Sequence, residues 1–202
     1  MPHDCLHMTV LEVTHSRKAE EIRSLVEVLR PGVSKIVNHT LSHRARLVKP
    51  LISYDAAAIA LSFLPAAGEA PHDGRTLDDD QYTYHHLRRD LYGLTKDTGV
   101  AVYSRYTVPS SHLTVARFIT AEDFAKNNHK GMKVTENKKM RALIENIETI
   151  NAWLEAEYWP QLDSSRLKDG GEWIVGEEQG LDCRQGRLWY GGGETVQRGE
   201  GF

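Results

Sequence analysis

The chain has 202 residues, of which 40% are hydrophobic and 26% are charged, and its formal net charge is -3. This composition is typical of a soluble globular protein, and the length suits either one domain of two lobes or two small domains. The negative balance excludes the broad basic surface that holds long duplex nucleic acid. A small nucleotide or a short RNA end can still be bound by local groups.

No stretch of the sequence predicts a membrane segment or a secretion signal. The longest apolar run, over residues 56–67, is shorter than the roughly 18 residues that a transmembrane helix needs, and it contains Ser62 and Pro65. The first residues lack the apolar core of a signal peptide. Cys5 and Cys183 are far apart, and we expect two reduced thiols rather than a disulfide. We therefore predict a cytoplasmic protein, with the nucleus as the alternative compartment, and no membrane partner.

Apolar periodicity and turn residues predict helices and strands in no regular βαβ order. In the first half of the chain, apolar residues alternate or recur at helical spacing, and breaker residues separate the segments. The predicted segments are a strand over residues 5–13, a helix over 18–29 that ends at Pro31 and Gly32, a short helix over 33–43, strands over 46–54 and 57–63 joined at Asp55, and a Gly/Pro/Ala-rich loop over 65–75.

In the second half of the chain, an acidic run at residues 78–80 suits the positive end of a helix dipole and predicts a helix start. The predicted segments are a helix over residues 77–97, strands over 100–107 and 112–119, a short helix over 120–127, a long helix over 135–157, a strand over 173–175 and a hairpin over 180–190 that turns at Gln185 and Gly186. This order predicts an α+β fold with mostly antiparallel pairing, in a single domain over residues 1–202.

Two short stretches, residues 6–10 and 111–115, share the pattern histidine, any residue, threonine, valine. Side chains two apart on a strand point to the same face. His7 is therefore expected to share a face with Thr9, and His112 with Thr114, while the residues between them point the other way. Two strands that each offer an imidazole and a hydroxyl predict a catalytic cleft.

Chance accounts for one match of this kind but not easily for two. With 10 His and 13 Thr in the chain, about 0.6 His-x-Thr matches are expected at random. Here both matches are followed by Val, and both lie in strand-like settings. The structural alternative remains open at this point: two half-buried strand histidines beside threonines of good strand propensity.

The four residues suit the hydrolysis of a phosphodiester whose leaving group is an adjacent ribose hydroxyl. One imidazole can deprotonate the attacking water and the other can protonate the departing oxygen, because histidine titrates near neutral pH. The two hydroxyls can donate to the non-bridging phosphate oxygens. This division of labour needs no metal and no other cofactor, and the sequence does not say which histidine is the base.

The motifs at residues 7–10 and 112–115 resemble the two signatures of the 2H phosphoesterase superfamily, the RNA ligase-like and cyclic nucleotide phosphodiesterase group. The run at residues 187–193 resembles the end of fungal-type members of this group. The resemblance implies a bilobal 2H-phosphoesterase-like fold, in which two antiparallel sheets face a central cleft and the helices lie outside.

The same resemblance implies a hydrolase that opens 2′,3′-cyclic phosphates of nucleotides or RNA ends without a metal. It makes His7 and His112 the catalytic residues and Thr9 and Thr114 the phosphate-binding residues. Two alternatives remain: a 2′,5′-phosphodiesterase or 3′-end RNA exonuclease that uses the same residues, and a non-catalytic module that binds a nucleotide or an RNA end.

The chain departs from the family at its start. Members have a strand before the first motif strand, whereas only six residues precede His7. We expect this strand to be absent, or removed by truncation, which leaves an open sheet edge that favours pairing with another chain. The oligomeric state is not predicted further.

Two tyrosines are candidates for stacking on a base. Tyr106 lies close to the second motif and Tyr190 in the predicted terminal hairpin, although strand aromatics more often lie in a core. Arg117 follows the second motif, but strand alternation puts it on the face away from His112. Unless a bulge intervenes, we expect Arg117 to form an ion pair at the strand end.

His39 and His43 are four residues apart and could share a metal ion on a helix. No third ligand follows at a useful spacing, so we expect surface or partly buried histidines, and a metal-dependent hydrolase is the weakest alternative. The adjacent pair at residues 85–86 is expected on a solvated helix face, because neighbours on a helix point about 100° apart.

Overall fold

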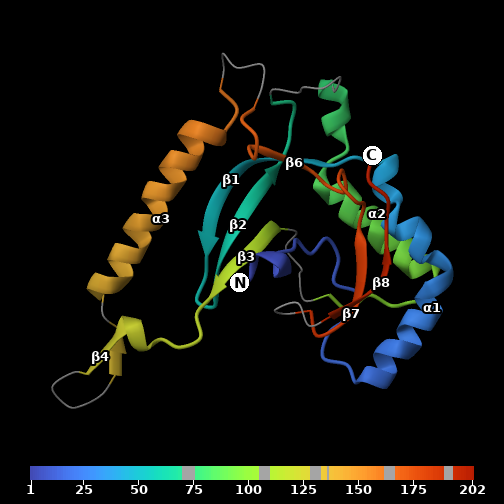
Figure 1. The fold of residues 1–202 in the computed structure, drawn as a ribbon, viewed down its shortest axis with the longest axis horizontal. Coiled ribbons are helices and arrows are strands. Elements are labelled where there is room, and N and C mark those ends of the chain that lie inside the picture. Colours follow the sequence, from blue (N-terminus) through green and yellow to red (C-terminus); the bar gives the residue numbers. More distant parts are fainter. Residues whose placement is uncertain (70–75, 105–109, 128–132, 136, 162–166, 189–192) are drawn as a thin grey trace.

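A computed structural model of the chain describes residues 1–69, 76–104, 110–127, 133–135, 137–161, 167–188 and 193–202. Its largest sheet has four antiparallel strands in the order β3-β2-β1-β6 (Figure 1). The strands of this sheet are β1 (Arg46–Tyr54), β2 (Ala58–Pro65), β3 (Ser111–Arg117) and β6 (Glu172–Ile174).

Two further sheets of two antiparallel strands are described, and together with the helices they confirm the predicted α+β class. They pair β4 (Ala125–Asn127) with β5 (Lys133–Thr135), and β7 (Asp182–Gly186) with β8 (Gly193–Arg198). The helices are α1 (Ala19–Val37), α2 (Tyr84–Asp97) and α3 (Asn137–Tyr158), with short 3-10 helices η1 (His3–Cys5), η2 (His39–Leu41), η3 (Leu77–Gln81) and η4 (Glu122–Phe124). Among the described residues, no helix is both long and apolar enough to cross a membrane.

Helix α2 covers one face of the four-stranded sheet. Its apolar residues Tyr84, Leu87 and Leu91 recur at helical spacing and are almost fully buried against Leu47 and Phe63 of the sheet. Fully burying side chains of this size stabilises the fold by about 1.5–3 kcal/mol each. The main core therefore lies between α2 and this face, so the opposite face is left for other contacts.

Helix α3 lies on the other side of the sheet and packs against β1 (Figure 1). The Asn151 side chain accepts a hydrogen bond from the Ile52 backbone N–H at 2.6 Å and donates to the Ile52 carbonyl at 2.9 Å. The Trp159 indole donates to the Pro50 carbonyl at 2.9 Å. These hydrogen bonds pair the backbone groups of Pro50 and Ile52 in the part of β1 that β6 does not reach.

A buried ion network ties β1 to two other elements. The side chain of Arg46 is fully buried and donates two hydrogen bonds to Asp80 of η3, at 3.1 and 2.6 Å, and one to Glu172 of β6 at 3.0 Å. Asp80 also accepts from the backbone N–H of Gly68. Asp80 therefore has a structural role. The acidic run at residues 78–80, predicted to begin a helix over 77–97, lies in the short helix η3, which is separate from α2.

The predicted end of the first helix at Pro31 and Gly32 is wrong, because α1 continues through both residues to Val37. A proline inside a helix loses one backbone hydrogen bond and crowds the carbonyl four residues earlier. The burial of Val33 and Val37, which follow Pro31 in α1, opposes that cost. Gly32 marks a close approach instead: a Cβ there would lie 2.4 Å from the Thr98 Cγ2 atom. The expected helix over residues 33–43 is accordingly the end of α1 followed by η2.

Three predicted strand segments also differ. Residues 5–13 form no strand: Cys5 is the last residue of η1, Met8 forms an isolated bridge, and the other residues have irregular backbone. Residues 100–104 form no strand, and residues 105–107 lie outside the described part of the chain. The partner of β7 is β8, beyond the predicted hairpin over 180–190, so the turn after Gly186 is longer than expected.

Candidate functional site

The two motif segments meet in space through one backbone pairing. Met8 and Leu113 form an isolated antiparallel bridge, which joins the N-terminal segment to the edge strand β3. Both side chains pack against the core cluster under α2. Directly opposite residues in an antiparallel pair share a face, so this face of both segments is the core face.

The four predicted site residues flank this bridge. In an antiparallel register centred on Met8 and Leu113, His7 lies opposite Thr114 and Thr9 lies opposite His112. Because neighbouring residues on an extended segment alternate, all four side chains belong to the face that α2 does not cover. His7 is exposed, and the other three are half-buried. The bridge thus brings side by side two motif segments that are far apart in sequence.

Each histidine is held through Nδ1 by a group two residues earlier. The Nδ1 atom of His7 is 2.9 Å from the carbonyl oxygen of Cys5, and that of His112 is 3.0 Å from the Ser110 hydroxyl. A carbonyl oxygen only accepts, so Nδ1 of His7 carries the proton in this hydrogen bond. Its Nε2 atom is then the acceptor in the neutral ring. The Ser110 hydroxyl can donate or accept and does not fix the tautomer of His112.

A β-bulge changes the expected position of Arg117. Ala60 pairs with Thr114 and Ala58 pairs with Arg117, so β3 carries one residue more than β2 over this stretch, and the register shifts. Ala58 and Ala60 share a face, and Arg117 therefore lies on the same face as Thr114. The expectation from simple alternation, which put Arg117 on the opposite face from His112, is wrong at this bulge.

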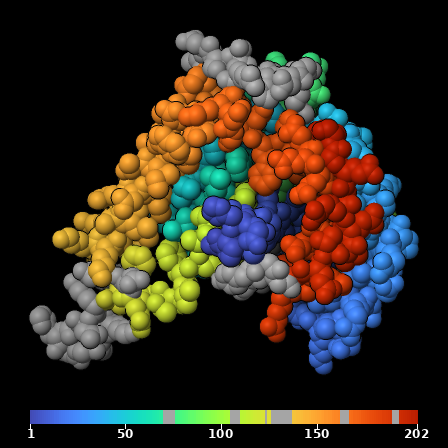
Figure 2. Space-filling model, in the orientation of Figure 1, coloured from blue at the N-terminus to red at the C-terminus, as the bar shows by residue number. Residues whose placement is uncertain are grey.

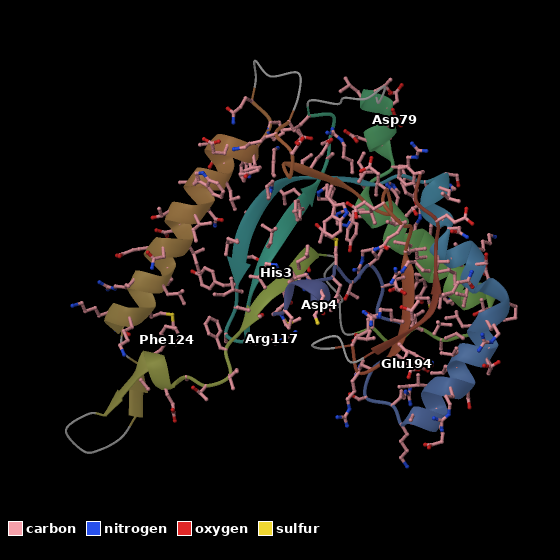
Figure 3. The ribbon with its side chains drawn as sticks, in the orientation of Figure 1. His3, Asp4, Asp79, Arg117, Phe124 and Glu194 are labelled. Atoms are coloured by element: carbon pink, nitrogen blue, oxygen red, sulfur yellow. The ribbon has the colours of Figure 1, made fainter. Side chains whose placement is uncertain are left out.

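The electrostatics of the turn between β1 and β2 agree with this placement. Asp55 accepts backbone hydrogen bonds from Ala57 and Ala58, which lower the pKa of its carboxyl, and the charges of Arg117 and His112 lower that pKa further. Arg117 and His112 therefore both lie close enough to influence this carboxylate. Figure 3 labels Arg117 near the end of β3, and His3 and Asp4 on the N-terminal segment.

Hydroxyl groups continue along the same face onto the next two strands. Ser62 of β2 pairs directly with His112 of β3. Its Oγ atom lies 2.6 Å from the Oγ atom of Ser53 on β1. Two hydroxyls on this sheet face, beside Ala60, therefore connect His112 to β1, the strand that α3 covers.

The two tyrosines predicted to stack on a base, Tyr106 and Tyr190, both lie outside the described residues. A third tyrosine, Tyr103, is 58% exposed and has the guanidinium of Arg17 over its ring at 5.5 Å. Space-filling Figure 2 shows the N-terminal segment at the surface, between the β1–β2 region and the C-terminal hairpin.

His39 and His43 do not converge on a metal position. Their rings stack at a centroid distance of 4.1 Å with an interplanar angle of 6°, and His39 Nε2 is 3.1 Å from the hydroxyl of Tyr82. Burial lowers the pKa of His39, and the nearby His43 lowers it further. Within the described part of the chain, no group of three or more His, Cys, Asp or Glu residues could hold a metal ion.

The two cysteines are free, as expected. Cys5 lies in η1, and partial desolvation and the carboxylate of Asp4 raise the pKa of its thiol. Cys183 lies in β7, where burial and Asp182 raise its thiol pKa. A raised pKa leaves a smaller fraction of each thiol as thiolate near neutral pH, so the imidazoles are the groups better suited to acid–base chemistry.

One contact to the first motif has no signal in the sequence. The hydroxyl of Tyr84, on α2, donates to the backbone carbonyl of Thr9 at 3.2 Å, across 75 positions of the chain. Sequence periodicity marks Tyr84 only as an apolar helix position.

Comparison with known proteins found no similar protein: no protein-family model, no curated protein and no solved structure matches this chain.

Proposed function

We propose that this protein is a metal-independent phosphodiesterase that opens 2′,3′-cyclic phosphates of nucleotides or short RNA ends. The observation that carries the proposal is the bridge between Met8 and Leu113. An antiparallel register continued from this bridge puts two imidazoles and two hydroxyls on one face, and this arrangement supports an acid–base hydrolysis of a phosphodiester.

His7 is the general base in this proposal. Its Nδ1 proton is committed to the Cys5 carbonyl, so the neutral ring offers the Nε2 lone pair to a water molecule. The side chain is exposed, which allows solvent to reach that nitrogen. Activated water attacks the phosphorus atom as its proton passes to His7.

His112 is the general acid. The hydroxyl of Ser110 can accept a hydrogen bond from Nδ1 when the ring is protonated, and the proton that is transferred is the one on Nε2. As the new oxygen–phosphorus bond forms, the bond from phosphorus to one ribose oxygen breaks. That oxygen takes the Nε2 proton of His112, and the product is a phosphate monoester beside a free hydroxyl.

The hydroxyls of Thr9 and Thr114 donate to the non-bridging oxygens of the phosphate, where negative charge builds up in the transition state. The bulge that turns Arg117 onto the same face supplies a planar guanidinium suited to bidentate phosphate contact. The site needs no cofactor for these steps. We also propose that the fold is bilobal, with the four-stranded sheet in one lobe and the β7–β8 hairpin in the other, on either side of the N-terminal segment.

Substrate choice is tested by offering the unmodified protein several linkages in excess chelator. The panel contains 2′,3′-cyclic AMP, a short RNA with a 2′,3′-cyclic phosphate end, a 2′,5′-linked oligoadenylate and an RNA with a 3′-hydroxyl end. We expect hydrolysis of the two cyclic phosphates, unaffected by the chelator. Preferred cleavage of either of the other two contradicts the proposed substrate, and tight binding of all four without turnover contradicts the catalytic proposal.

A further inference from the structure

The first motif lies in a segment with little regular backbone pairing. Residues 6–13 form no strand, and Met8 is the one residue of this segment with a strand-type bridge in the described part of the chain. By contrast, Thr114 of the second motif sits inside β3, which pairs with β2 along its length. The position of Thr9 therefore depends on contacts outside a sheet more strongly than the position of Thr114 does.

A buried tyrosine supplies such a contact. Tyr84 is fully buried at the start of α2 and is part of the main core. Its hydroxyl donates to the Thr9 carbonyl oxygen at 3.2 Å. A phenol that is packed on all sides has few alternative positions, so the hydrogen bond fixes the backbone of Thr9 relative to α2.

An arginine one turn further along α2 completes the arrangement. The guanidinium of Arg88 lies 6.0 Å from the centre of the Tyr84 ring. Burial raises the pKa of the Tyr84 hydroxyl, and Arg88 opposes that rise through its charge and a hydrogen bond to the phenol. The Thr9 carbonyl oxygen can only accept, so the Tyr84 hydroxyl is the donor in the Tyr84–Thr9 hydrogen bond. Arginine has donors only, so Arg88 does not compete for the Tyr84 proton.

We propose that Tyr84, supported by Arg88, is a positioning residue for the first motif: it sets the place of the Thr9 hydroxyl at the phosphate. The role rests on the proposed phosphodiesterase function, since Thr9 is the group that touches the substrate. Tyr84 itself lies on the core side and does not reach the reacting atoms. Its removal therefore acts on catalysis through the backbone of Thr9.

The first test compares Tyr84→Phe with the unmodified protein on 2′,3′-cyclic AMP. Phenylalanine keeps the ring in the core and removes only the hydroxyl. We expect kcat to fall about tenfold with KM nearly unchanged, because a misplaced donor chiefly costs transition-state stabilisation. The matched control is Tyr82→Phe, whose hydroxyl, next to the start of the same helix, bonds to Asp90 at 2.9 Å. We expect this control to keep kcat within about twofold of the unmodified protein, since Asp90 lies outside the site.

A double-mutant cycle separates positioning from general destabilisation. Thr9→Ala is expected to lower kcat about a hundredfold by removing the donor itself. If Tyr84 acts through Thr9, adding Tyr84→Phe to Thr9→Ala lowers kcat no further. A full additional tenfold loss in the double variant overturns the proposal. If Tyr84→Phe unfolds at the assay temperature, Arg88→Met takes its place in the cycle, with a smaller loss in the same direction.

A measurement that does not depend on activity tests the role of Tyr84 separately from the proposed phosphodiesterase function. Amide hydrogen exchange at residues 8–10 is expected to be at least about tenfold faster in Tyr84→Phe than in Tyr82→Phe, because the segment loses its tie to α2. Equal exchange in the two variants contradicts the role of Tyr84, whatever the activity. An inactive unmodified protein whose exchange still responds to Tyr84→Phe contradicts the phosphodiesterase function and leaves the positioning contact standing.

Discussion

Met8 and Leu113 face each other across an isolated antiparallel bridge that joins the N-terminal segment to β3, and this pairing sets the register of both motifs. A shift by one residue would turn His7 and Thr9 toward the core under α2. The bridge therefore decides whether four polar side chains meet on one face.

The register can be measured by cross-linking. In a background with Cys5→Ser and Cys183→Ser, we expect Met8→Cys combined with Leu113→Cys to form a disulfide under mild oxidation. Residues directly opposite in an antiparallel pair are about 4.5–5.5 Å apart between Cα atoms, within the range of a disulfide. The control joins Met8→Cys to Ala116→Cys, three residues further along β3 and roughly 10 Å away. Cross-linking of the control pair instead would contradict the register.

Arg117 is expected to contribute to catalysis because the bulge in β3 turns it onto the motif face. We predict that Arg117→Gln lowers kcat/KM about a hundredfold, the scale of losing one donor to a charged transition state. Arg117→Lys is expected to recover only part of the loss, since lysine cannot make a bidentate contact. Steady-state kinetics on 2′,3′-cyclic AMP measure both variants. An unchanged kcat/KM in Arg117→Gln would show that this guanidinium has no role in catalysis and only forms an ion pair at the strand end.

The buried network around Arg46 predicts a large effect on stability. Asp80→Asn removes one charge of a pair whose arginine is fully buried, and we expect it to lower the free energy of unfolding by about 3–5 kcal/mol. The control is Glu157→Gln, which breaks the exposed pair with Lys168 and should cost less than about 1 kcal/mol. Urea unfolding of the two variants measures the difference. Equal costs would mean that the Arg46 network contributes no more than a surface ion pair.

The stacked histidines predict a decline of stability at acidic pH. Burial and His43 lower the pKa of His39 below its ordinary value, with Lys35 acting in the same direction and Asp90 opposing it. The unfolded chain then binds a proton more readily than the folded protein, so this contribution is fully present above about pH 6.5 and is lost as the pH falls below it. We expect the drop in Tm between pH 7.5 and pH 5.5 to be smaller in His39→Asn than in the unmodified protein. A drop of the same size in both would contradict the assignment to His39.

Local sequence patterns were sufficient to predict those helices and strands whose apolar residues follow a regular spacing along the segment. Strand β1 and helix α3 follow alternation and helical spacing over many residues, and both lie where the pattern predicts them. Pro31 and Gly32 led to a wrong prediction of the helix end, because α1 continues through both residues and passes close to Thr98 at Gly32. A tertiary contact thus overrode a local preference.

The site could be predicted only in its residue types. The repeated His-x-Thr pattern selected the four side chains, but the register that brings them together is a long-range pairing with no local signal. The bulge that redirects Arg117 and the bond from Tyr84 to Thr9 likewise depend on partners distant in sequence. Periodicity describes one segment at a time, whereas these features arise between segments.

The most direct test of the account is the value of kcat/KM for 2′,3′-cyclic AMP in excess chelator, in His7→Ala and in His112→Ala. The matched control is His85→Ala, which removes an exposed imidazole of α2 away from the motifs. The two-histidine mechanism predicts a loss of at least about a hundredfold in each motif variant, the scale of a general acid or base, and near-normal activity in the control. Activity that survives either motif substitution would contradict the two-histidine mechanism.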